Sequence, residues 1–367
     1  MTVAAFDAVG LLQRTVATPS PSGAEQAVAE LLVEAMAGFA DEAAVDAAGN
    51  AVAVWGHGPL KITVLGHIDT VPGDIPVRLE DGVLHGRGAV DAKGSFCAAV
   101  AAVAGLDPAL KASLRVRLVG AVEEEAPSSK GARYAVEAYE RPDLVLIGEP
   151  SGWDAFTLGY KGRLIVRLEA QRPNVHSSRD EPTAPELAVA AYGAVRAFVE
   201  EANVGVEGLF DALQLSLQAL ASSNDGLTQR CVATLGFRLP PRWPPEALEA
   251  QLRSLSLPAG VTAEFVGPER AYRSERDSEL ARAFRVAIRS VGGRPRAKVK
   301  TGTSDMIVVA PSWDVPMLAY GPGDSALDHT PDERLEVDGY LRAVEVVRAA
   351  LGQLAVGRSR STRAERP

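Results

Sequence analysis

Apolar residues recur along the first 160 positions with two different periods. Residues 5–16 and 24–39 have helical spacing, the segment 18–23 (TPSPSG) interrupts it, and Ser22 is a candidate N-cap for the second helix. Short apolar runs typical of buried strands follow; they occupy residues 51–55, 62–65, 83–84, 114–121 and 144–147. An Ala-rich helix at 94–106 separates the third run from the fourth. Strands that alternate with helices predict an α/β domain with a largely buried sheet.

A different pattern begins near Lys161. Two segments, 163–170 and 232–239, alternate apolar and polar residues as half-buried strands do, and residues 185–201 between them have helical spacing. After Gly267 the first pattern returns; its elements are helices at 278–290 and 337–354 and a short strand at 317–320. These changes predict an α+β domain inserted into the α/β domain.

The predicted domain bounds follow from these changes of pattern. The discontinuous α/β domain takes residues 1–160 and 271–357, and the inserted α+β domain takes residues 161–270. Residues 358–367 contain four Arg and no apolar run, so we predict a disordered tail there. A chain of 367 residues is also long for a single core, which favours two domains.

Composition and charge narrow the class of protein. A formal charge of −9 argues against a general affinity for nucleic acid or for an anionic membrane. The N-terminus lacks the basic segment and apolar stretch of a secretory signal, and the apolar run 90–106 is too short to span a bilayer. The two cysteines, Cys97 and Cys231, cannot form a disulfide framework. We therefore expect a soluble protein of the reducing cytoplasm.

Potential metal ligands stand at the ends of the apolar runs. His67 and Asp69 end the second run, and because residues two apart on a strand face the same way, both side chains should enter one pocket. Asp91 precedes the Ala-rich helix in a glycine-rich turn, where a carboxylate can bridge two cations. The fourth run ends in three adjacent carboxylates, at residues 123–125, which destabilise a fold unless cations or hydrogen bonds compensate their charge.

Two further residues complete the candidate set. The run 144–147 continues into Glu149, and His329 lies near the C-terminus in the segment DHTPDERL. Taken singly, each candidate could be an ordinary strand end, helix cap or loop residue. Together, two His, one Asp and two Glu give mixed nitrogen and oxygen coordination, which suits two Zn²⁺ or Co²⁺ ions better than Mg²⁺. A third Glu then remains as a general base.

In their order along the chain these motifs resemble the M20 family of metallopeptidases and deacylases. The resemblance rests on GHIDTVP at 66–72, GRGAVDAKG at 86–94, the run ending in carboxylates at 118–125, Glu149 and His329, and it covers nearly the whole chain. It implies a di-metal catalytic domain built on a central, mostly parallel sheet, with an inserted α+β lid that usually mediates dimerisation. It further implies an enzyme that hydrolyses a linear amide bond with two divalent ions.

The resemblance also implies how the ligands are shared between the two ions. His67 and Glu149 would hold one metal ion, His329 and Glu125 the other, and Asp91 would bridge them.

The remaining roles follow from the same resemblance. Glu124 would be the general base and Asp69 would orient a ligand from behind, although a slip of one residue would move the base and ligand to Glu123 and Glu124. His176 matches a lid histidine that stabilises the oxyanion, often in the site of the partner subunit. Looser matches to substrate-binding positions are Asn224, Arg238, Gly302, Thr303 and Ser304.

The substrate class comes from two flanking segments. Residues 121–133 and 147–163 look most like the M20 subgroup that releases lysine or ornithine from the amino-group carrier protein LysW in lysine and arginine biosynthesis. The bond implied joins a carrier glutamate γ-carboxyl to the α-amino group of the released amino acid. Because that carrier is acidic, residues 281–300, with seven basic and no acidic side chains, are a candidate docking surface, with a solvated helix face as the alternative.

Other activities stay open at the level of sequence. Acetylornithine deacetylase and succinyl-diaminopimelate desuccinylase are alternatives within the family, as is an aminopeptidase. A metal-free binding protein on the same fold is the alternative from a different class.

Overall fold

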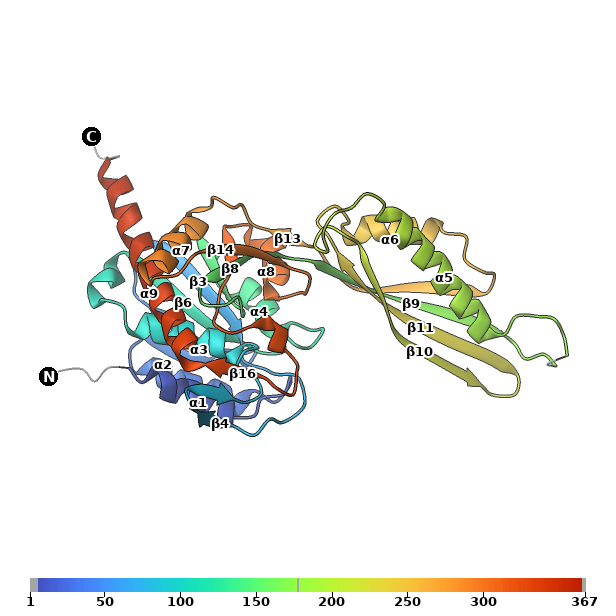
Figure 1. Cartoon of the computed structure of the whole chain (residues 1–367), viewed down its shortest axis with the longest axis horizontal. Helices are drawn as coiled ribbons and strands as arrows, with labels where there is room; N and C mark the ends of the chain where they lie inside the picture. Colours follow the sequence, from blue (N-terminus) through green and yellow to red (C-terminus); the bar gives the residue numbers. More distant parts are fainter. Residues whose placement is uncertain (1–5, 177, 365–367) are drawn as a thin grey trace. The chain divides into compact units, whose positions relative to one another are not determined.

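The computed structural model describes residues 6–176 and 178–364, without the side chains of 358–364 (Figure 1). The chain divides into two compact units. Unit 1 comprises Met1–Gly159, Ser274–Val299 and Ser304–Pro367, and unit 2 comprises Tyr160–Arg273 and Lys300–Thr303. The predicted lid at 161–270 did not include the segment 300–303. Hydrogen bonds join that segment to unit 2, from the Lys161 amide to the Gly302 carbonyl and from Arg238 to Thr303 Oγ1.

The central sheet of unit 1 is mostly parallel. In spatial order its strands are β1 (Glu42–Val45), β2 (Ala51–Trp55), β6 (Leu114–Ala121), β3 (Leu60–His67), β7 (Leu144–Gly148), β15 (Met317–Ala319) and β8 (Ala155–Tyr160), with β14 (Arg296–Lys300) also paired to β8. β3 runs parallel to β6 and β7, and β15 runs parallel to β7. The carboxyl ends of these four strands therefore meet at one edge. β3 and β7 are almost entirely buried, as parallel strands covered on both faces are.

Helices and a small sheet complete unit 1. The helices are α1 (Ala8–Ala17), α2 (Gln26–Ala37), α3 (Lys93–Ala104), α4 (Lys130–Ala138), α7 (Glu279–Ser290), α8 (Asp305–Trp313) and α9 (Val337–Ala364), with 3₁₀ turns η1 (Pro108–Ala112) and η2 (Ser325–Leu327). The small sheet has the order β16 (Arg334–Glu336), β5 (Val83–His85) and β4 (Arg78–Glu80). α3 is buried almost throughout and lies directly on the sheet. A Cβ atom on Gly120 would stand 2.8 Å from Ile68 and 3.0 Å from Phe96 of α3, so β6 requires glycine there.

Unit 2 is an antiparallel sheet covered by helices on one face. Its strands have the order β10 (Gln214–Asn224), β11 (Thr228–Leu239), β9 (Gly162–Pro173) and β12 (Val261–Glu269), its helices are α5 (Ala184–Ala202) and α6 (Pro245–Ser254), and the short β13 (Tyr272–Arg273) follows. Inward residues of β9 and β11, such as Val166 and Leu235, form a second core with α5 and α6. A capping box of Thr183 and Glu186 starts α5. The predicted fold class is thus confirmed, a mostly parallel α/β sheet plus a separate antiparallel α+β part.

The structure corrects two local predictions. α9 continues to Ala364, whereas a disordered tail was predicted over 358–367; residues 358–364 contain Arg and Ala, which favour helix, and neither Gly nor Pro. Residues 365–367 lie outside the described part. Ser22 does not cap α2, which begins at Gln26, because its hydroxyl donates to Asp69 Oδ2 instead, at 2.7 Å. Among the residues described, no helix is both long and apolar enough to cross a membrane.

Candidate metal centre

The carboxyl edge of the central sheet brings the candidate ligands together. β3 ends at His67, in register with the ends of β6 and β7. The chain after β6 carries the three adjacent glutamates, and the chain after β7 carries Glu149. Asp91 stands just before α3, and His329 lies in the loop before β16. An open α/β sheet places its functional residues at this edge because its loops converge there.

The five residues form two groups that share one aspartate. In the first group, His67 Nε2 lies 3.2 Å from Asp91 Oδ1 and 3.9 Å from Glu149 Oε1. In the second, His329 Nε2 lies 3.0 Å from Asp91 Oδ2 and 2.9 Å from Glu125 Oε1. Asp91 therefore presents one carboxylate oxygen to each group. This is the arrangement that a carboxylate bridging two metal ions requires.

The donor atoms fit divalent metal ions. In each group the candidate ligand atoms lie within 4.8 Å of one another, and they are imidazole nitrogens and carboxylate oxygens, which suit zinc or cobalt. Contacts with Asp91 and Glu125 raise the pKa of His329 to about 10. The pKa of Asp91 is far below its usual value, because His329 and His67 outweigh the effect of burial. In the metal-free site the carboxylates thus favour the protonated form of both histidines, and a dication would compete with those protons.

Asp69 contacts His67 at Nδ1, whereas Nε2 of the same ring faces Asp91. The Nδ1 atom of His67 lies 3.0 Å from the Asp69 backbone carbonyl, so an Nδ1–H can donate to it and leave Nε2 facing the ligand groups. The Asp69 side chain is completely buried. Burial opposes its charged form, but contacts with His67 and Ser22 bring the pKa of Asp69 below its usual value. The aspartate is thus a fixed negative charge beneath the site.

Of the three glutamates after β6, two contribute to the donor groups and one turns to other partners. Glu123 has a left-handed backbone (φ 57°), and its carboxylate accepts from Ser128 Oγ at 2.7 Å and lies 3.6 Å from Lys130 Nζ. Glu124 falls in a third group of candidate ligands, with His67 and Glu125. Burial, together with the charges of neighbouring carboxylates, raises the pKa of Glu124 well above its usual value. Glu125 alone of the three contacts His329.

The predicted lid residues lie in unit 2 at two separate places. His176 is exposed and contacts Ser178, and Asn224 lies beside Asn174, with 3.4 Å between the Nδ2 and Oδ1 atoms. Arg238 donates to Thr303 Oγ1 at 2.9 Å. Asn224 is opposite Gln229 on β11, nine residues from Arg238, so roughly 30 Å of strand separates the two sites. Unit 2 of one chain does not bring these residues together.

The segment after β14 crosses the boundary between the units. Gly302 and Thr303 belong to unit 2, whereas Ser304 belongs to unit 1, where it caps α8 and is buried. Asp305, the first residue of α8, was not predicted to act. It is 3% exposed, and neither carboxylate oxygen has a hydrogen-bond partner among the residues that the structure describes. Burial raises the pKa of Asp305 to about 8, and Asp69 and Glu149 act in the same direction.

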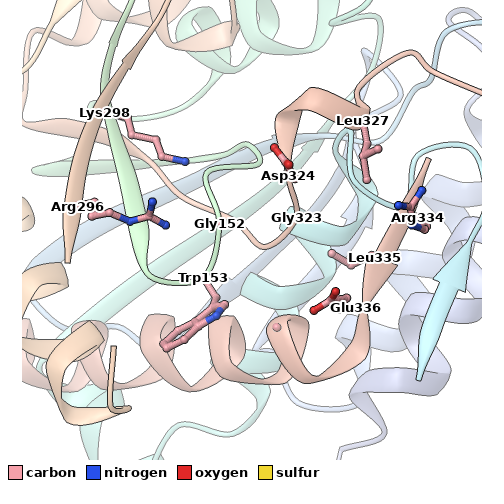
Figure 2. Close-up of a pocket in the computed structure, with 11 residues that line it drawn as sticks. Gly152, Trp153, Arg296, Lys298, Gly323, Asp324, Leu327, Arg334, Leu335 and Glu336 are labelled. Carbon is pink, nitrogen blue, oxygen red and sulfur yellow. The ribbon is translucent and has the colours of Figure 1, made fainter. Parts of the chain in front are cut away.

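A pocket of about 490 Å³ adjoins the loops that carry two of the ligands (Figure 2). Trp153 in its wall follows Glu149 by four residues, and Leu327 precedes His329 by two. Figure 2 shows Arg296 and Lys298 reaching toward the loop at Gly152. Three basic side chains line the pocket, those of Arg296, Lys298 and Arg334, against the two acidic side chains of Asp324 and Glu336.

Sequence reasoning did not identify the residues that hold the ligand loops. Glu25 is buried, and its Oε1 atom accepts from the amides of Gly23, at 2.8 Å, and Glu123, at 3.2 Å. Glu333 is 1% exposed and accepts from the amides of Val90 and Asp91. Glu25 follows the segment TPSPSG by two residues, and Glu333 lies within the segment DHTPDERL, which was the available signal, but an acidic residue in a polar segment is ordinarily solvated.

Comparison with known proteins gives one family. The model of Peptidase family M20/M25/M40 matches residues 63–353. The chain is 53% identical, over 95% of its length and 97% of the relative, to a protein of Deinococcus radiodurans named LysW-lysine hydrolase. It is 26% identical to a succinyl-diaminopimelate desuccinylase of Corynebacterium glutamicum, over 95% of this chain and 96% of that one.

Solved structures share the fold. The M20 family metallo-carboxypeptidase Sso-CP2 from Sulfolobus solfataricus matches with a TM-score of 0.78 at 19% identity, covering 95% of this chain and 99% of that one. Human carnosine dipeptidase 1 matches with a TM-score of 0.70 at 19% identity, covering 95% and 96%.

Proposed function

The chain belongs to peptidase family M20/M25/M40, and we propose that it is a metal-dependent hydrolase that releases lysine, or ornithine, from the C-terminal glutamate of a carrier protein such as LysW. One observation carries the chemistry. Two groups of nitrogen and oxygen donors share Asp91, which turns a different carboxylate oxygen to each. The carrier substrate is supported by the LysW-lysine hydrolase that is 53% identical to this chain.

The proposed ligands follow the two groups. His67 and Glu149 hold one ion, His329 and Glu125 hold the other, and Asp91 bridges them, with Zn²⁺ or Co²⁺ as the ions. When bound, such ions polarise the scissile carbonyl and lower the pKa of a shared water.

The proton transfers fall to Glu124 in this proposal. Glu124 accepts the proton of the attacking water and returns it to the leaving amine, and its carboxylate lies within 4.8 Å of the candidate ligand atoms of His67 and Glu125. The alternative register, with Glu123 as base and Glu124 as ligand, is disfavoured by the contacts of Glu123 with Ser128 and Lys130. Asp69 keeps the imidazole of His67 in one tautomer.

The lid residues support a homodimer. His176 would stabilise the oxyanion, and Asn224, Arg238, Gly302, Thr303 and Ser304 would contact the substrate. Because Asn224 and Arg238 lie roughly 30 Å apart on one sheet, a single unit 2 cannot offer both to one scissile bond. We therefore propose that His176 acts in the site of the partner subunit.

Complementation between two inactive variants tests this assignment. In an equal mixture of His176→Ala and Glu124→Gln, half of the dimers are mixed, and a His176 that acts across the dimer leaves each with one intact site. About a quarter of wild-type activity should then return after subunit exchange. No recovery, although native mass spectrometry shows mixed dimers, would contradict action across the dimer.

The docking surface for the carrier can be narrowed within residues 281–300. Arg285 of α7 already contacts Asp277, at 3.0 Å, and the Arg276 carbonyl. Arg296 and Lys298 line the pocket beside the ligand loops (Figure 2), where Arg296 pairs with Asp154 at 2.6 Å and Lys298 Nζ donates to the Ser151 carbonyl at 2.7 Å. We propose that these two residues, rather than the α7 arginines, receive acidic groups of the carrier.

Charge reversal tests the docking proposal. Arg296→Glu with Lys298→Glu should raise KM for the carrier substrate while leaving a small acyl-lysine almost unaffected. The matched control is Arg282→Glu with Arg289→Glu on α7. An equal effect of both pairs on the carrier would contradict the pocket assignment.

Mass spectrometry of free lysine released from a carrier that ends in γ-glutamyl-lysine tests the function itself. Parallel assays with acetylornithine and a succinylated diamino acid test the alternative family activities. Chelation should abolish release, and Zn²⁺ or Co²⁺ should restore it. A protein that binds no metal and releases nothing would be the metal-free binding protein, which the complete donor set disfavours. The two free, buried cysteines support the cytoplasm as the location that we propose.

A further inference from the structure

Glu333 is a buried carboxylate that contacts the loop of the bridging aspartate. Its side chain is 0% exposed. The Oε1 atom accepts hydrogen bonds from the backbone amides of Val90, at 3.0 Å, and Asp91, at 3.1 Å. The Glu333 carbonyl accepts a further bond from the Gly86 amide at 3.3 Å. Both ends of the loop that delivers Asp91 are therefore bonded to one residue more than 240 positions away in the chain.

Arg87 completes the connection from the side of the aspartate loop. Its Nη1 atom donates to Glu333 Oε2 at 2.8 Å and to the Thr330 carbonyl at 3.2 Å, and its Nε atom donates to the Gly73 carbonyl at 3.0 Å. The Arg87 side chain is 14% exposed. Thr330 directly follows His329, so Arg87 contacts the histidine loop as well.

These contacts join the two loops whose ligands meet in the second donor group. Asp91 Oδ2 and His329 Nε2 lie 3.0 Å apart, although nothing in the local sequence sets that distance. His329 has a left-handed backbone (φ 60°), which a non-glycine residue keeps only when its surroundings hold it. Arg87 bonds to the Thr330 carbonyl and to Glu333, so the two residues restrain the loop on the C-terminal side of His329.

We propose that Glu333, paired with Arg87, is a positioning residue that sets the distance and angle between Asp91 and His329 and so the affinity for the second metal ion. The proposal rests on the proposed metal-dependent function but concerns residues that contact neither metal nor substrate. A carboxylate suits the position because it accepts from two amides and a guanidinium at once. Arg87 in turn compensates the buried charge, which alone would destabilise the loop.

Metal binding by purified, metal-stripped protein tests the proposal directly. Titration calorimetry with Zn²⁺ or Co²⁺ should show that Glu333→Ala lowers the affinity for the second metal ion by about 10- to 100-fold, the usual effect of losing a residue that orients a ligand. Glu333→Gln should lose less, because its amide oxygen can still accept from both backbone amides. In the metal-saturated enzyme, kcat should fall with KM little changed, because the reacting groups move and the substrate contacts stay.

Asp41→Ala is the matched control. Asp41 also accepts from a backbone amide, that of Gly56 at 2.7 Å, and pairs with a cation, Lys111. It lies at the β1–β2 end of the sheet and contacts no ligand loop. We expect Asp41→Ala to lower the unfolding midpoint while leaving metal affinity unchanged.

Each outcome decides the proposal. If Glu333→Ala is folded and binds two ions with wild-type affinity, the proposal is wrong. It is also wrong if Glu333→Gln binds the second metal ion as weakly as Glu333→Ala does. If Glu333→Ala does not fold, Arg87→Gln takes its place. This variant removes the ion pair but leaves both hydrogen bonds from the backbone amides to Glu333. Unchanged metal affinity in Arg87→Gln would equally refute the idea. A wild-type protein that binds two ions but hydrolyses no amide would overturn the proposed function while leaving this metal-affinity test intact.

Discussion

The register of the three glutamates after β6 gives the sharpest test of the site. Replacing Glu124 by Gln keeps the shape of the side chain and removes the carboxylate that would take the proton of the attacking water. A general base contributes about 10²- to 10⁴-fold to a rate, which corresponds to about 3 to 5 kcal/mol in the activation barrier. We therefore expect kcat of Glu124→Gln to fall by about that factor, with KM nearly unchanged and both metal ions retained.

The two neighbours serve as controls at the same strand end. Glu125→Gln should lose metal, because Glu125 lies 2.9 Å from His329 in the second donor group. Glu123→Gln should keep metal and most activity, because its carboxylate contacts Ser128 and Lys130 instead. An exposed pair of this kind contributes about 0 to 1 kcal/mol to stability, so little change in the unfolding midpoint is expected.

The assay pairs steady-state kinetics on the carrier substrate with elemental analysis of bound metal. If Glu123→Gln loses the activity and Glu124→Gln loses the metal, the register is shifted by one residue and our assignment is wrong. If all three variants lose both the activity and the bound metal, the glutamates act only as a structural unit, and the separate roles are refuted.

Three further results are expected from the same structure. The raised pKa of His329 stabilises the metal-free protein, so this contribution to the free energy of unfolding should be complete below about pH 6.5 and disappear as pH rises through about 10. Urea unfolding of the metal-free protein across this pH range measures the contribution. A free energy of unfolding that does not change with pH would count against the His329 contacts. Gly120→Ala should lower the free energy of unfolding by about 1 to 3 kcal/mol, because the new Cβ atom would stand 2.8 Å from Ile68. Thermal unfolding at the wild-type temperature would show that the sheet can adjust at this position. Thr183→Ala removes the capping box of α5 and should lower the free energy of unfolding of unit 2 by about 1 kcal/mol without altering metal affinity. A change in metal affinity would show that the start of this helix is coupled to the site.

The local hydrophobic pattern explains why so much of the fold was predictable. Strands β3 and β7 are buried almost throughout, and β6 is buried over its last four residues, so they appear in the sequence as apolar runs that end in polar residues. Strand β10 was not predicted, although its first residues, QLSLQA, alternate polar and apolar side chains; every residue from Ser216 to Asn224 is exposed. A strand at the edge of a sheet is stabilised by hydrogen bonds to its neighbour, which a single segment of sequence does not reveal.

The sequence by itself determined which residue types end the buried strands, and hence that histidines and carboxylates would stand at one edge of a sheet. Only the tertiary structure decided how they divide, with Asp91 offering one oxygen to His67 and the other to His329. It also placed Glu124 and Glu125, but not Glu123, in a donor group. It brought Glu333 to the Asp91 loop across more than 240 residues. The physical reason is that a strand end follows from local burial, whereas a distance of about 3 Å between side chains depends on backbone bonds between loops remote in sequence.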